Sequence, residues 1–570
     1  MDLLGVADSF FDVIVVIAVA LALAPFFGSY IGRVYLNRPA FGDTILLPLE
    51  RAIYRLVGTS PRHSMSAREY IVALLLLNGM MFLTLFLIFF FQGSLPYNPL
   101  GIGDMSWRLA IHSAASYATN TDFTHYTAET QMSFIGDDVG IQLAAYLSAA
   151  TGLATVAAML RGFIRKDGTI GNFYVDIVRT LTRILLPIAF VGALVLVLLG
   201  VPETLNAYVM IHPLSGGTQI IPMGPDASFE SIILLGTNGG AWYTANAAFP
   251  LTNPTAISND FETWLMMLID FSFPFAFAAI VRKKGEALPY VGTILFVFFI
   301  ALGLFTFAQY QANPALNGIP FLSNPVGGYP VGQEMRFSLG EQSLFQVVSV
   351  YSNVGANNMA LGSLHPLAQL VLLFGMFTQS TPGGEGTGFA TLLINALLAV
   401  FIGGLMVGRT PEYLGKKITT AHIKWVALVL LIHPVSILVP FAGTLLGNFV
   451  TFPPGDLATN AHSFTVVLYE FTSESANNGS AMGAAWYNDD TPWFNLAGAA
   501  VMLVGRFIPI IAMLMIGGLF SKQEVQPPGP GTLRTRSLTF TVYLTLLLII
   551  VTALLFLPVM ALGPLAQLGL

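Results

Sequence analysis

The sequence contains no cysteine, and only 9% of its 570 residues are charged. Without cysteine, disulfide bonds and thiolate metal sites are excluded. So few charges could not cover the surface of a soluble protein of this length, and no polar stretch is long enough to form a separate soluble domain. Hydrophobic residues make up 55% of the chain, and the mean hydropathy is +0.72. These values indicate an integral membrane protein.

Long apolar segments predict an all-α polytopic membrane protein with about ten transmembrane helices. Uncharged runs such as 70–91 exceed the roughly 20 residues that a helix needs to cross a bilayer. The first segment has no positively charged stretch before it and no small-residue cleavage site, so we expect a retained helix rather than a signal peptide. The predicted crossings lie near residues 10–30, 70–91, 139–161, 177–200, 261–281, 288–310, 366–407, 421–446, 494–520 and 537–559.

The distribution of basic residues predicts the orientation in the membrane. Of the 24 Lys and Arg residues, 21 lie in the segments that follow the odd-numbered crossings, with the helix ends included. Basic residues accumulate on the cytoplasmic side of membrane proteins. We therefore expect these linkers in the cytoplasm and both termini outside.

The seventh segment, 366–407, is too long for one straight helix. Such a helix would measure roughly 63 Å, about twice the hydrocarbon thickness. Two helices joined by STPGGEGTG would explain the length, but a hairpin would place Arg409, Lys416 and Lys417 outside. We therefore expect one crossing interrupted by a Gly-rich loop at 380–388. Irregular backbone at membrane depth is tolerated only inside protein or beside a wet cavity, so this loop is a candidate gate.

The four outer linkers share one plan. Each carries a short, mostly apolar segment that is too brief to span the membrane, at 107–118, 228–236, 343–351 and 463–471. Each segment then breaks into small polar residues, in the order TNTD, TNGG, SNVGANN and SANNGSAMG. The asparagines Asn120, Asn238, Asn353 and Asn477 are 118, 115 and 124 residues apart. This period predicts four parallel repeats of helix, pore loop and helix around a pseudo-fourfold axis.

Four such loops around one axis are suited to binding a cation. Half-helices that enter from outside direct their partially negative C-terminal ends toward the membrane interior. The Gly-rich backbone after them can turn its carbonyl oxygens toward a common axis and replace the hydration shell of an ion. Uncharged oxygen ligands suit a large monovalent ion, whereas Ca²⁺ or Mg²⁺ sites would need several carboxylates. K⁺ is the expected ligand, although a single TNGG would more simply be an extracellular turn.

Other features of the chain are less specific. Arg506 lies in an apolar helix, where an unpaired cation costs roughly 2.5–3.5 kcal/mol, so it must face a polar interior or a carboxylate such as Glu385 or Asp270. A structural ion pair and a role in gating both stay open. The eight histidines are scattered, and no pair has convincing metal-ligand spacing. The sequence shows no phosphate loop and no nucleophile–base pair, so we expect neither an enzyme nor a nucleotide site.

Six short stretches carry a family resemblance: PMGPDAS (222–228), GTNGG (236–240), NPTA (253–256), GRTPEYLGKKI (408–418), ANNGSA (476–481) and VGRF (504–507). Together they resemble the KdpA family, the channel-like, potassium-binding component of the bacterial potassium-importing P-type ATPase of the Kdp system. The similarity runs from the first crossing to the end of the chain, and GRTPEYLGKKI alone is highly specific.

The resemblance implies a component of a bacterial or archaeal cell-membrane complex. Its partners would be a P-type ATPase subunit, which hydrolyses ATP, and small accessory membrane subunits, with no nucleic acid involved. Extracellular K⁺ would enter a selectivity filter and pass sideways through an intramembrane tunnel to the ATPase subunit, while the broken helix blocks the direct path. No nucleotide would bind to the potassium-binding component itself.

Family motifs place the expected K⁺-binding and gating residues. The filter would comprise Thr119, Asn120, Thr121, Asp122, Thr237, Asn238, Gly239, Gly240, Ser352, Asn353, Val354, Gly355, Asn477, Asn478 and Gly479. Its narrowest ring would contain Gly239, Gly355 and Gly479. The gate would comprise Thr381, Pro382, Gly383, Gly384, Glu385 and Gly386, with Arg506 as a buried charge nearby.

Three residues depart from the family pattern. Asp122 stands where relatives carry Asn, Val354 where a small Cys-type residue is usual, and Gln379 where Glu is expected. A carboxylate about 4 Å from a bound cation contributes on the order of 4 kcal/mol at an effective dielectric of 20. An ionised Asp122 that faces the axis would therefore tighten cation binding.

We expect six segments along the chain: 1–69 with the first helix and a cytoplasmic linker, pore repeats at 70–170, 171–284, 285–419 and 420–522, and a final helix at 523–570. The alternative function is a stand-alone K⁺ channel or secondary transporter of the same four-repeat architecture. A membrane enzyme or a scaffold is disfavoured, because neither explains four neutral polar loops.

Overall fold

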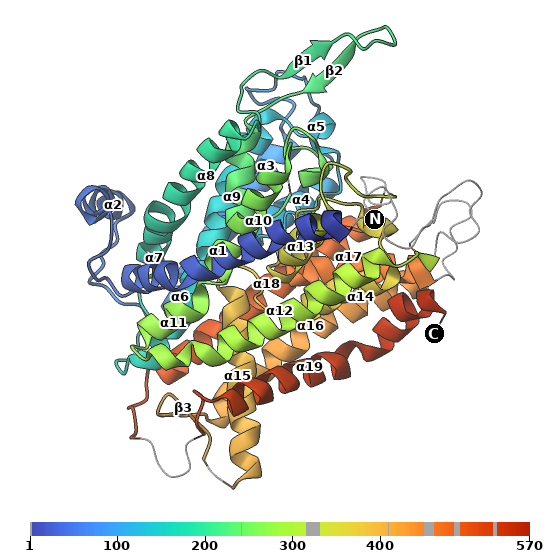
Figure 1. Ribbon diagram of the computed structural model, residues 1–570. Helices are drawn as coiled ribbons and strands as arrows, with labels where there is room; N and C mark the ends of the chain where they lie inside the picture. Colours follow the sequence, from blue (N-terminus) through green and yellow to red (C-terminus); the bar gives the residue numbers. More distant parts are fainter. Residues whose placement is uncertain are drawn as a thin grey trace.

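Among the described residues, ten helices are long and apolar enough to cross a membrane, in agreement with the prediction of about ten. The computed structural model describes residues 3–240, 242–314, 331–408, 410–447, 449, 461–483, 491–527 and 533–569. The spans found in this part of the chain are Phe10–Tyr35, Ala67–Phe90, Ile135–Ile164, Phe173–Leu198, Ala256–Ile280, Lys284–Tyr310, Thr387–Met406, Thr420–Gly447, Pro492–Phe520 and Leu538–Leu568. The two ends of the chain lie on the same side of the bundle (Figure 1), as an even number of crossings requires. Which side faces outward stays a prediction.

Four helix–half-helix–helix repeats lie between the first and last helices, α1 (Leu3–Tyr35) and α19 (Leu538–Met560). The first repeat has α3 (Ala67–Phe90), α4 (Trp107–Ala118) and α6 (Gln142–Ile164), and the second has α7 (Phe173–Arg179), α8 (Leu186–Leu198), α9 (Asp226–Leu235), α10 (Ala256–Asp270) and α11 (Phe273–Ile280). The third has α12 (Leu288–Tyr310), α13 (Leu339–Tyr351), α14 (Pro366–Thr378) and α15 (Thr387–Met406), and the fourth has α16 (Thr420–Gly447), α17 (Ala461–Ala476) and α18 (Pro492–Phe520).

The half-helices α4, α9, α13 and α17 fall where the sequence places them, with small differences at their ends. α13 begins earlier than predicted, because Ser338 caps it: the Ser338 hydroxyl accepts from the Glu341 N–H, and the Glu341 carboxylate accepts from the Ser338 N–H. This reciprocal capping box stabilises the first turn.

The repeats close into a ring. Each half-helix packs against a helix of the neighbouring repeat: α6 contacts α9, α10 contacts α13, α14 contacts α17, and α18 contacts α4. The last contact joins the fourth repeat to the first. This closed order is the pseudo-fourfold arrangement that the period of the sequence predicts, and it brings the four loops that follow the half-helices to the centre.

Burial separates inner from outer spans. Ile135–Ile164 and Ala256–Ile280 are each 83% buried over their most apolar window, whereas Phe10–Tyr35 and Ala67–Phe90 are 28% buried. The outer helices therefore present apolar side chains to the lipid. The inner helices carry the small and polar residues that support the centre.

The seventh crossing is interrupted close to the predicted position. α14 ends at Thr378 and α15 begins at Thr387, with Gln379 (φ 51°) and Gly386 (φ 65°) in left-handed or related backbone conformations at the two junctions. A helix cannot continue through such angles, so the break is built into the backbone. Arg409, one of the basic residues used to orient this crossing, lies outside the described residues.

A short hairpin of β3 (Glu412–Tyr413) and β4 (Lys416–Lys417) follows α15 at one end of the molecule, and the hairpin of β1 (Tyr208–Ile211) and β2 (Gln219–Pro222) lies at the other (Figure 1). The buried Lys416 ammonium donates to the carbonyl oxygens of Gly162 and Phe520, at 3.1 and 2.7 Å, and to that of Arg165. A cation at the C-terminal ends of α6 and α18 is favoured by the helix dipole. The family-like motif at 408–418 therefore docks the hairpin onto two pore helices.

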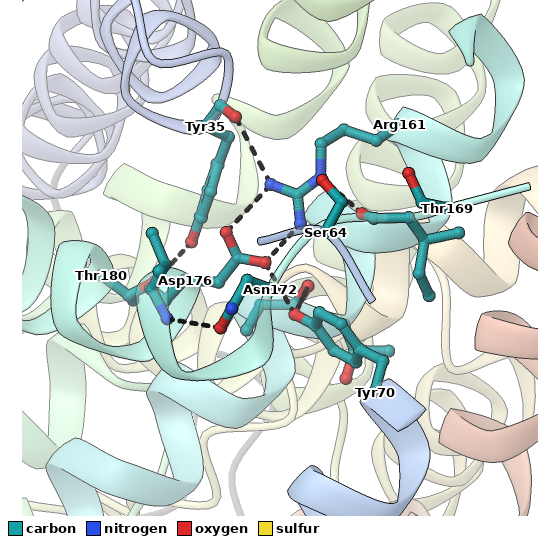
Figure 2. A network of polar contacts seen from close by, with 12 residues as sticks. Tyr35, Ser64, Tyr70, Arg161, Thr169, Asn172, Asp176 and Thr180 are labelled. Carbon is teal, nitrogen blue, oxygen red and sulfur yellow. Dashed lines mark hydrogen bonds and ion pairs between the residues drawn. The ribbon is translucent and has the colours of Figure 1, made fainter. Parts of the chain in front are cut away.

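A buried ion pair ties the first two repeats together on the side of β3. The Arg161 guanidinium on α6 pairs with both oxygens of the Asp176 carboxylate on α7, and the Tyr70 hydroxyl on α3 donates to the same carboxylate at 2.9 Å. Figure 2 shows Arg161 reaching Tyr35 of α1 as well, through the Tyr35 carbonyl oxygen at 3.4 Å. The buried Arg161–Asp176 pair and its hydrogen bonds thus join four helices, namely α1, α3, α6 and α7.

The amphipathic helix α2 (Asp43–Val57) follows α1 and stands apart from the bundle in Figure 1. Its Asp43 and Glu50 side chains pair with Arg183 of the second repeat, while Ile45 and Leu56 remain exposed. The sequence predicts only a cytoplasmic linker for this segment, and the structure shows that the linker contains a helix.

Candidate ion-binding site

The four polar loops meet at the centre of the bundle, and we call them the loop ring: residues 119–122, 237–240, 352–355 and 477–479. All of these residues are buried apart from the partly buried Gly479. Each loop starts at the C-terminal end of a half-helix. The ring therefore collects four partially negative helix ends.

One hydrogen bond recurs in all four loops and sets their register. In each case a loop N–H donates to a carbonyl oxygen of the preceding half-helix, with similar lengths. The bonds are Thr121 to Ser116 (3.0 Å), Asn238 to Ile233 (2.8 Å), Val354 to Ser349 (2.7 Å) and Asn478 to Ser473 (2.9 Å). Thr121, Asn238, Val354 and Asn478 are thus structurally equivalent.

Backbone angles confirm this register and correct one assumption of the sequence analysis. The residue before each equivalent position has a positive φ, at Asn120 (62°), Thr237 (43°), Asn353 (51°) and Asn477 (54°). The spacing of the asparagines pairs Asn238 with Asn120, and the backbone angles show that this pairing is wrong. Thr237 is the counterpart of Asn120. The stretches TNTD and TNGG both begin with Thr-Asn, which hides the shift of one residue between the two loops.

The residue after each equivalent position also has a positive φ: Asp122 (50°), Gly239 (73°), Gly355 (89°) and Gly479 (92°). Three of the four are glycine, which adopts this conformation without strain. The fourth is Asp122, and Asp is among the few other residue types that tolerate it.

The glycines also allow neighbouring loops to touch. A Cβ added to Gly239 would overlap the Val354 carbonyl oxygen, one on Gly355 would overlap that of Asn478, and one on Gly479 would overlap that of Thr121. Each glycine thus lies against the next loop in the order second, third, fourth, first. Asp122 sits at the remaining junction, where its Cβ would lie 3.3 Å from one placed on Gly240.

Side-chain amides brace the loops behind the backbone. Asn120 donates to the carbonyl oxygens of Gly236 and Thr237, at 3.1 and 2.7 Å, and so links the first loop to the second. Its own amide oxygen accepts from Asn238 at 3.0 Å and from the Ser148 hydroxyl of α6 at 2.8 Å. Ser148 is a member of this network that the sequence analysis missed, because it lies in an ordinary small-residue helix.

The fourth loop is braced in the same manner. Asn477 donates to the Thr121 hydroxyl at 2.9 Å and to the Met502 carbonyl oxygen at 3.2 Å. Asn478 reaches the Val350 carbonyl oxygen of α13 at 3.2 Å. Amide side chains therefore hold three of the four loop junctions while leaving the loops free of ion pairs.

The interrupted helix lies against the second and third loops. The Gly383 N–H donates to the Tyr351 carbonyl oxygen at 2.8 Å, and the Glu385 N–H donates to the Thr237 hydroxyl at 3.0 Å. A Cβ on Gly384 would lie 3.2 Å from the Asn353 Cβ. The predicted gate residues Thr381, Pro382, Gly383, Gly384, Glu385 and Gly386 are all buried in this loop, directly next to the ring.

A small cavity is lined jointly by the loop ring, the interrupted helix and α18. Its volume is about 30 Å³, counted as the space open to the centre of a water-sized sphere. The first positive-φ residue of every loop lines it, together with the break in the helix and a charged side chain: Asn120, Thr237, Asn353, Asn477, Gln379, Gly384 and Arg506. The four loops therefore share one central space.

Arg506 faces this polar interior, as its burial requires. Its guanidinium donates to the Ser148 carbonyl oxygen at 3.1 Å. No ion pair within 4 Å joins it to Glu385 or Asp270 in the part of the chain that the structure describes, although both Asp270 and Arg506 interact electrostatically with Glu385. Both oxygens of the buried Glu385 carboxylate lack a hydrogen-bond partner. Of the two surroundings expected for Arg506, the structure thus shows a polar interior, with the Glu385 carboxylate as a charge nearby.

With one exception, the oxygen atoms that the loop ring offers as ligands belong to uncharged groups. The loops offer main-chain carbonyls and the hydroxyl and amide groups of Thr, Ser and Asn, a set of groups that suits a weakly hydrated monovalent cation better than a divalent one. Asp122 is the one carboxylate among the fifteen predicted filter residues.

Comparison with known proteins identifies relatives over almost the whole chain. The family model described as the potassium-transporting ATPase A subunit, KdpA, matches residues 14–568. A protein of Nostoc sp. named potassium-transporting ATPase potassium-binding subunit is 39% identical over 551 residues, which is 97% of this chain and 97% of the relative. The protein of the same name from Alicyclobacillus acidocaldarius is 39% identical over 571 residues, covering 100% of this chain and 99% of the relative.

Among solved structures, the potassium transporter TrkH from Vibrio parahaemolyticus has a similar fold. The TM-score is 0.50 at 14% sequence identity, and the match covers 89% of this chain and 98% of that chain. At this level of identity the likeness concerns the fold alone.

Proposed function

Because the chain belongs to the KdpA family of potassium-transporting ATPases, we propose that it binds extracellular K⁺ in the loop ring and delivers the ion to the ATPase subunit of an uptake complex. The family is that of the A subunit, which is not the ATP-hydrolysing subunit, and the relatives of this chain are named potassium-binding subunits. The loop ring is the K⁺ site, with the fifteen predicted residues as its lining.

Closure of the ring is the observation that carries this proposal. Gly239, Gly355 and Gly479 each lie against a carbonyl oxygen of the next loop, and the same N–H bond recurs in every loop. Four equivalent segments in contact around one centre can present a set of carbonyl oxygens in place of a hydration shell. The amide braces behind them keep the ring from collapsing when no ion is present.

The interrupted helix supports a sideways path for the ion. Its loop is hydrogen-bonded to the ends of two pore segments, at Tyr351 and Thr237, on the side of the ring that carries the cavity. An ion that leaves the ring meets this loop and the Arg506 guanidinium, which repels cations. We propose that the direct route to the cytoplasm is blocked here and that K⁺ leaves through an intramembrane tunnel to the partner subunit.

The partners follow from the family. An ATPase subunit would supply the energy of transport, and small accessory membrane subunits would complete the complex in the cell membrane of a bacterium or archaeon, with both termini of this chain outside. The second candidate function is a stand-alone K⁺ channel or secondary transporter of the same four-repeat architecture; the solved structure with a similar fold is itself named a potassium transporter.

Purification from the native membrane separates the two functions. The proposal predicts that the chain co-purifies with a P-type ATPase and that ATP hydrolysis by the complex is stimulated by K⁺. An ATPase-free chain that conducts K⁺ passively in liposomes would instead support the channel.

A further inference from the structure

A buried cluster of two histidines and two glutamates lies behind the first and fourth loops. His112 is on α4, His125 follows the first loop, and Glu470 and Glu474 are on α17. All four are between 0% and 1% exposed. The proposed K⁺ path uses none of these four residues. The spacing of His112 and His125 in the sequence does not predict a pair, because only the fold brings them together.

The geometry of the cluster is compact. The His112 and His125 rings stack with centroids 3.8 Å apart and an angle of 14°. The Nε2 atom of His112 is 3.4 Å from the Glu474 Oε1 atom, and that of His125 is 2.9 Å from the Glu470 Oε1 atom. Ligand atoms of His112, His125 and Glu474 all lie within 4.8 Å of one another.

Several polar atoms of the cluster have no hydrogen-bond partner. These are Nδ1 of His112 and Oε2 of Glu470 and of Glu474. No Lys or Arg pairs with either glutamate among the described residues. Two carboxylates whose only basic neighbours in the described part of the chain are histidines, at no more than 1% exposure, are costly to bury unless a cation compensates them.

We propose that His112, His125, Glu470 and Glu474 bind a divalent transition-metal ion that cross-links the first and fourth repeats. Two imidazole nitrogens and two carboxylates neutralise the charge of such an ion, and N/O donors at bond lengths of about 2.0–2.2 Å give donor atoms roughly 3.4 Å apart in a tetrahedron. The 3.4 Å between His112 and Glu474 matches that edge.

The surroundings of His125 fit a metal ligand. Its Nδ1 atom lies 2.7 Å from the Asn495 amide oxygen on α18, which orients the ring and leaves Nε2 toward Glu470. Metal-bound histidines commonly donate their other ring N–H to such an acceptor. Phe123 packs edge-on against both rings, with ring centroids 6.3 Å from His112 and 5.3 Å from His125.

The metal content of the full chain, purified with its partner subunits, tests the proposal. After loading with Zn²⁺ and treatment with a mild chelator, mass spectrometry should find close to one more Zn²⁺ per wild-type chain than per His112→Asn/His125→Asn chain. Loading with Co²⁺ should give the visible absorption of a four-coordinate nitrogen–oxygen site in the wild type only. His422→Asn is the matched control, since His422 is equally buried and also has an unpaired ring nitrogen, and it should retain the metal.

Glu474→Gln keeps the shape of the side chain and removes its charge, so it tests the site if the double variant does not fold. It should elute as a monodisperse complex with its bound Zn²⁺ strongly reduced. A wild-type complex that retains no Zn²⁺ or Co²⁺ after loading, or variants that retain as much as the wild type, would overturn the proposal.

Discussion

Gly239 lies directly against the Val354 carbonyl oxygen of the neighbouring loop, with no room for a side chain between them. The same relationship joins Gly355 to Asn478 and Gly479 to Thr121. Because these contacts run in one direction around the centre, a change at any one of them displaces the carbonyl oxygen of the next loop.

Replacement of Gly239 by Ser should therefore weaken K⁺ binding. Overpacking and a positive φ at a residue with a side chain cost about 1–3 kcal/mol each. We expect the K⁺ affinity of the complex, measured by K⁺-stimulated ATP hydrolysis, to fall by about tenfold or more, with weaker discrimination against Na⁺. The control is Gly303→Ser on α12, where a Cβ meets nothing within 4 Å. Unchanged affinity and selectivity in Gly239→Ser would remove Gly239 from the ion site.

Asp122 should make K⁺ binding depend on pH. Burial raises the pKa of the Asp122 carboxyl group well above its ordinary value, and neither oxygen of this carboxyl group has a hydrogen-bond partner. A carboxyl group that holds its proton more strongly than usual must release that proton before it can act as a negatively charged ligand for K⁺. We expect the K⁺ affinity of the wild type to rise with increasing pH.

The Asp122→Asn variant tests this link. It should bind K⁺ more weakly at high pH and show little dependence on pH, because no proton is released. Asp104→Asn, at an exposed residue on an outer loop, is the control for a general change in charge. A wild-type affinity that is flat between acidic and alkaline pH would show that Asp122 does not interact with the ion.

Shortening the loop at 382–388 should open a passive path for K⁺. The loop is fastened to Tyr351 and Thr237 beside the cavity, so its loss would connect the ring to the cytoplasmic side. The measurement is K⁺ efflux from liposomes that contain the complex without ATP. A shortened variant that stays impermeable to K⁺ would reduce this loop to a linker.

Arg161→Met should destabilise the complex strongly, because it leaves the Asp176 carboxylate buried without its cationic partner. Breaking a buried pair costs about 3–5 kcal/mol, whereas replacing both partners by apolar residues is often neutral. The double variant Arg161→Met/Asp176→Leu should therefore unfold at a higher temperature than the single variant. Equal melting temperatures for the two would show that the pair in Figure 2 contributes little.

Much of the architecture could be predicted from the sequence. Apolar runs of the right length indicated ten crossings, and the recurrence of short half-helices before polar residues indicated the four repeats, since both signals are local. The break near Gln379 was predictable for the same reason, because a run of glycines and a proline cannot continue a helix.

Relationships between distant segments could not be predicted from the sequence. The shift that makes Thr237 the counterpart of Asn120 depends on backbone angles, and the Ser148 brace depends on how α6 packs against two loops. The stacking of His112 on His125 depends on the path of the chain after the first loop. Such contacts arise from tertiary packing, to which a single sequence offers no local signal.

If main-chain oxygens of the four loops bind K⁺, then Rb⁺, which has similar chemistry and is easier to detect, should bind at the same place. A density map of the complex with Rb⁺ in place of K⁺ should show a strong peak in the loop ring, within coordination distance of the carbonyl oxygens of Thr121, Asn238, Val354 and Asn478. A ring without such a peak, in a complex that still transports Rb⁺, would contradict the account.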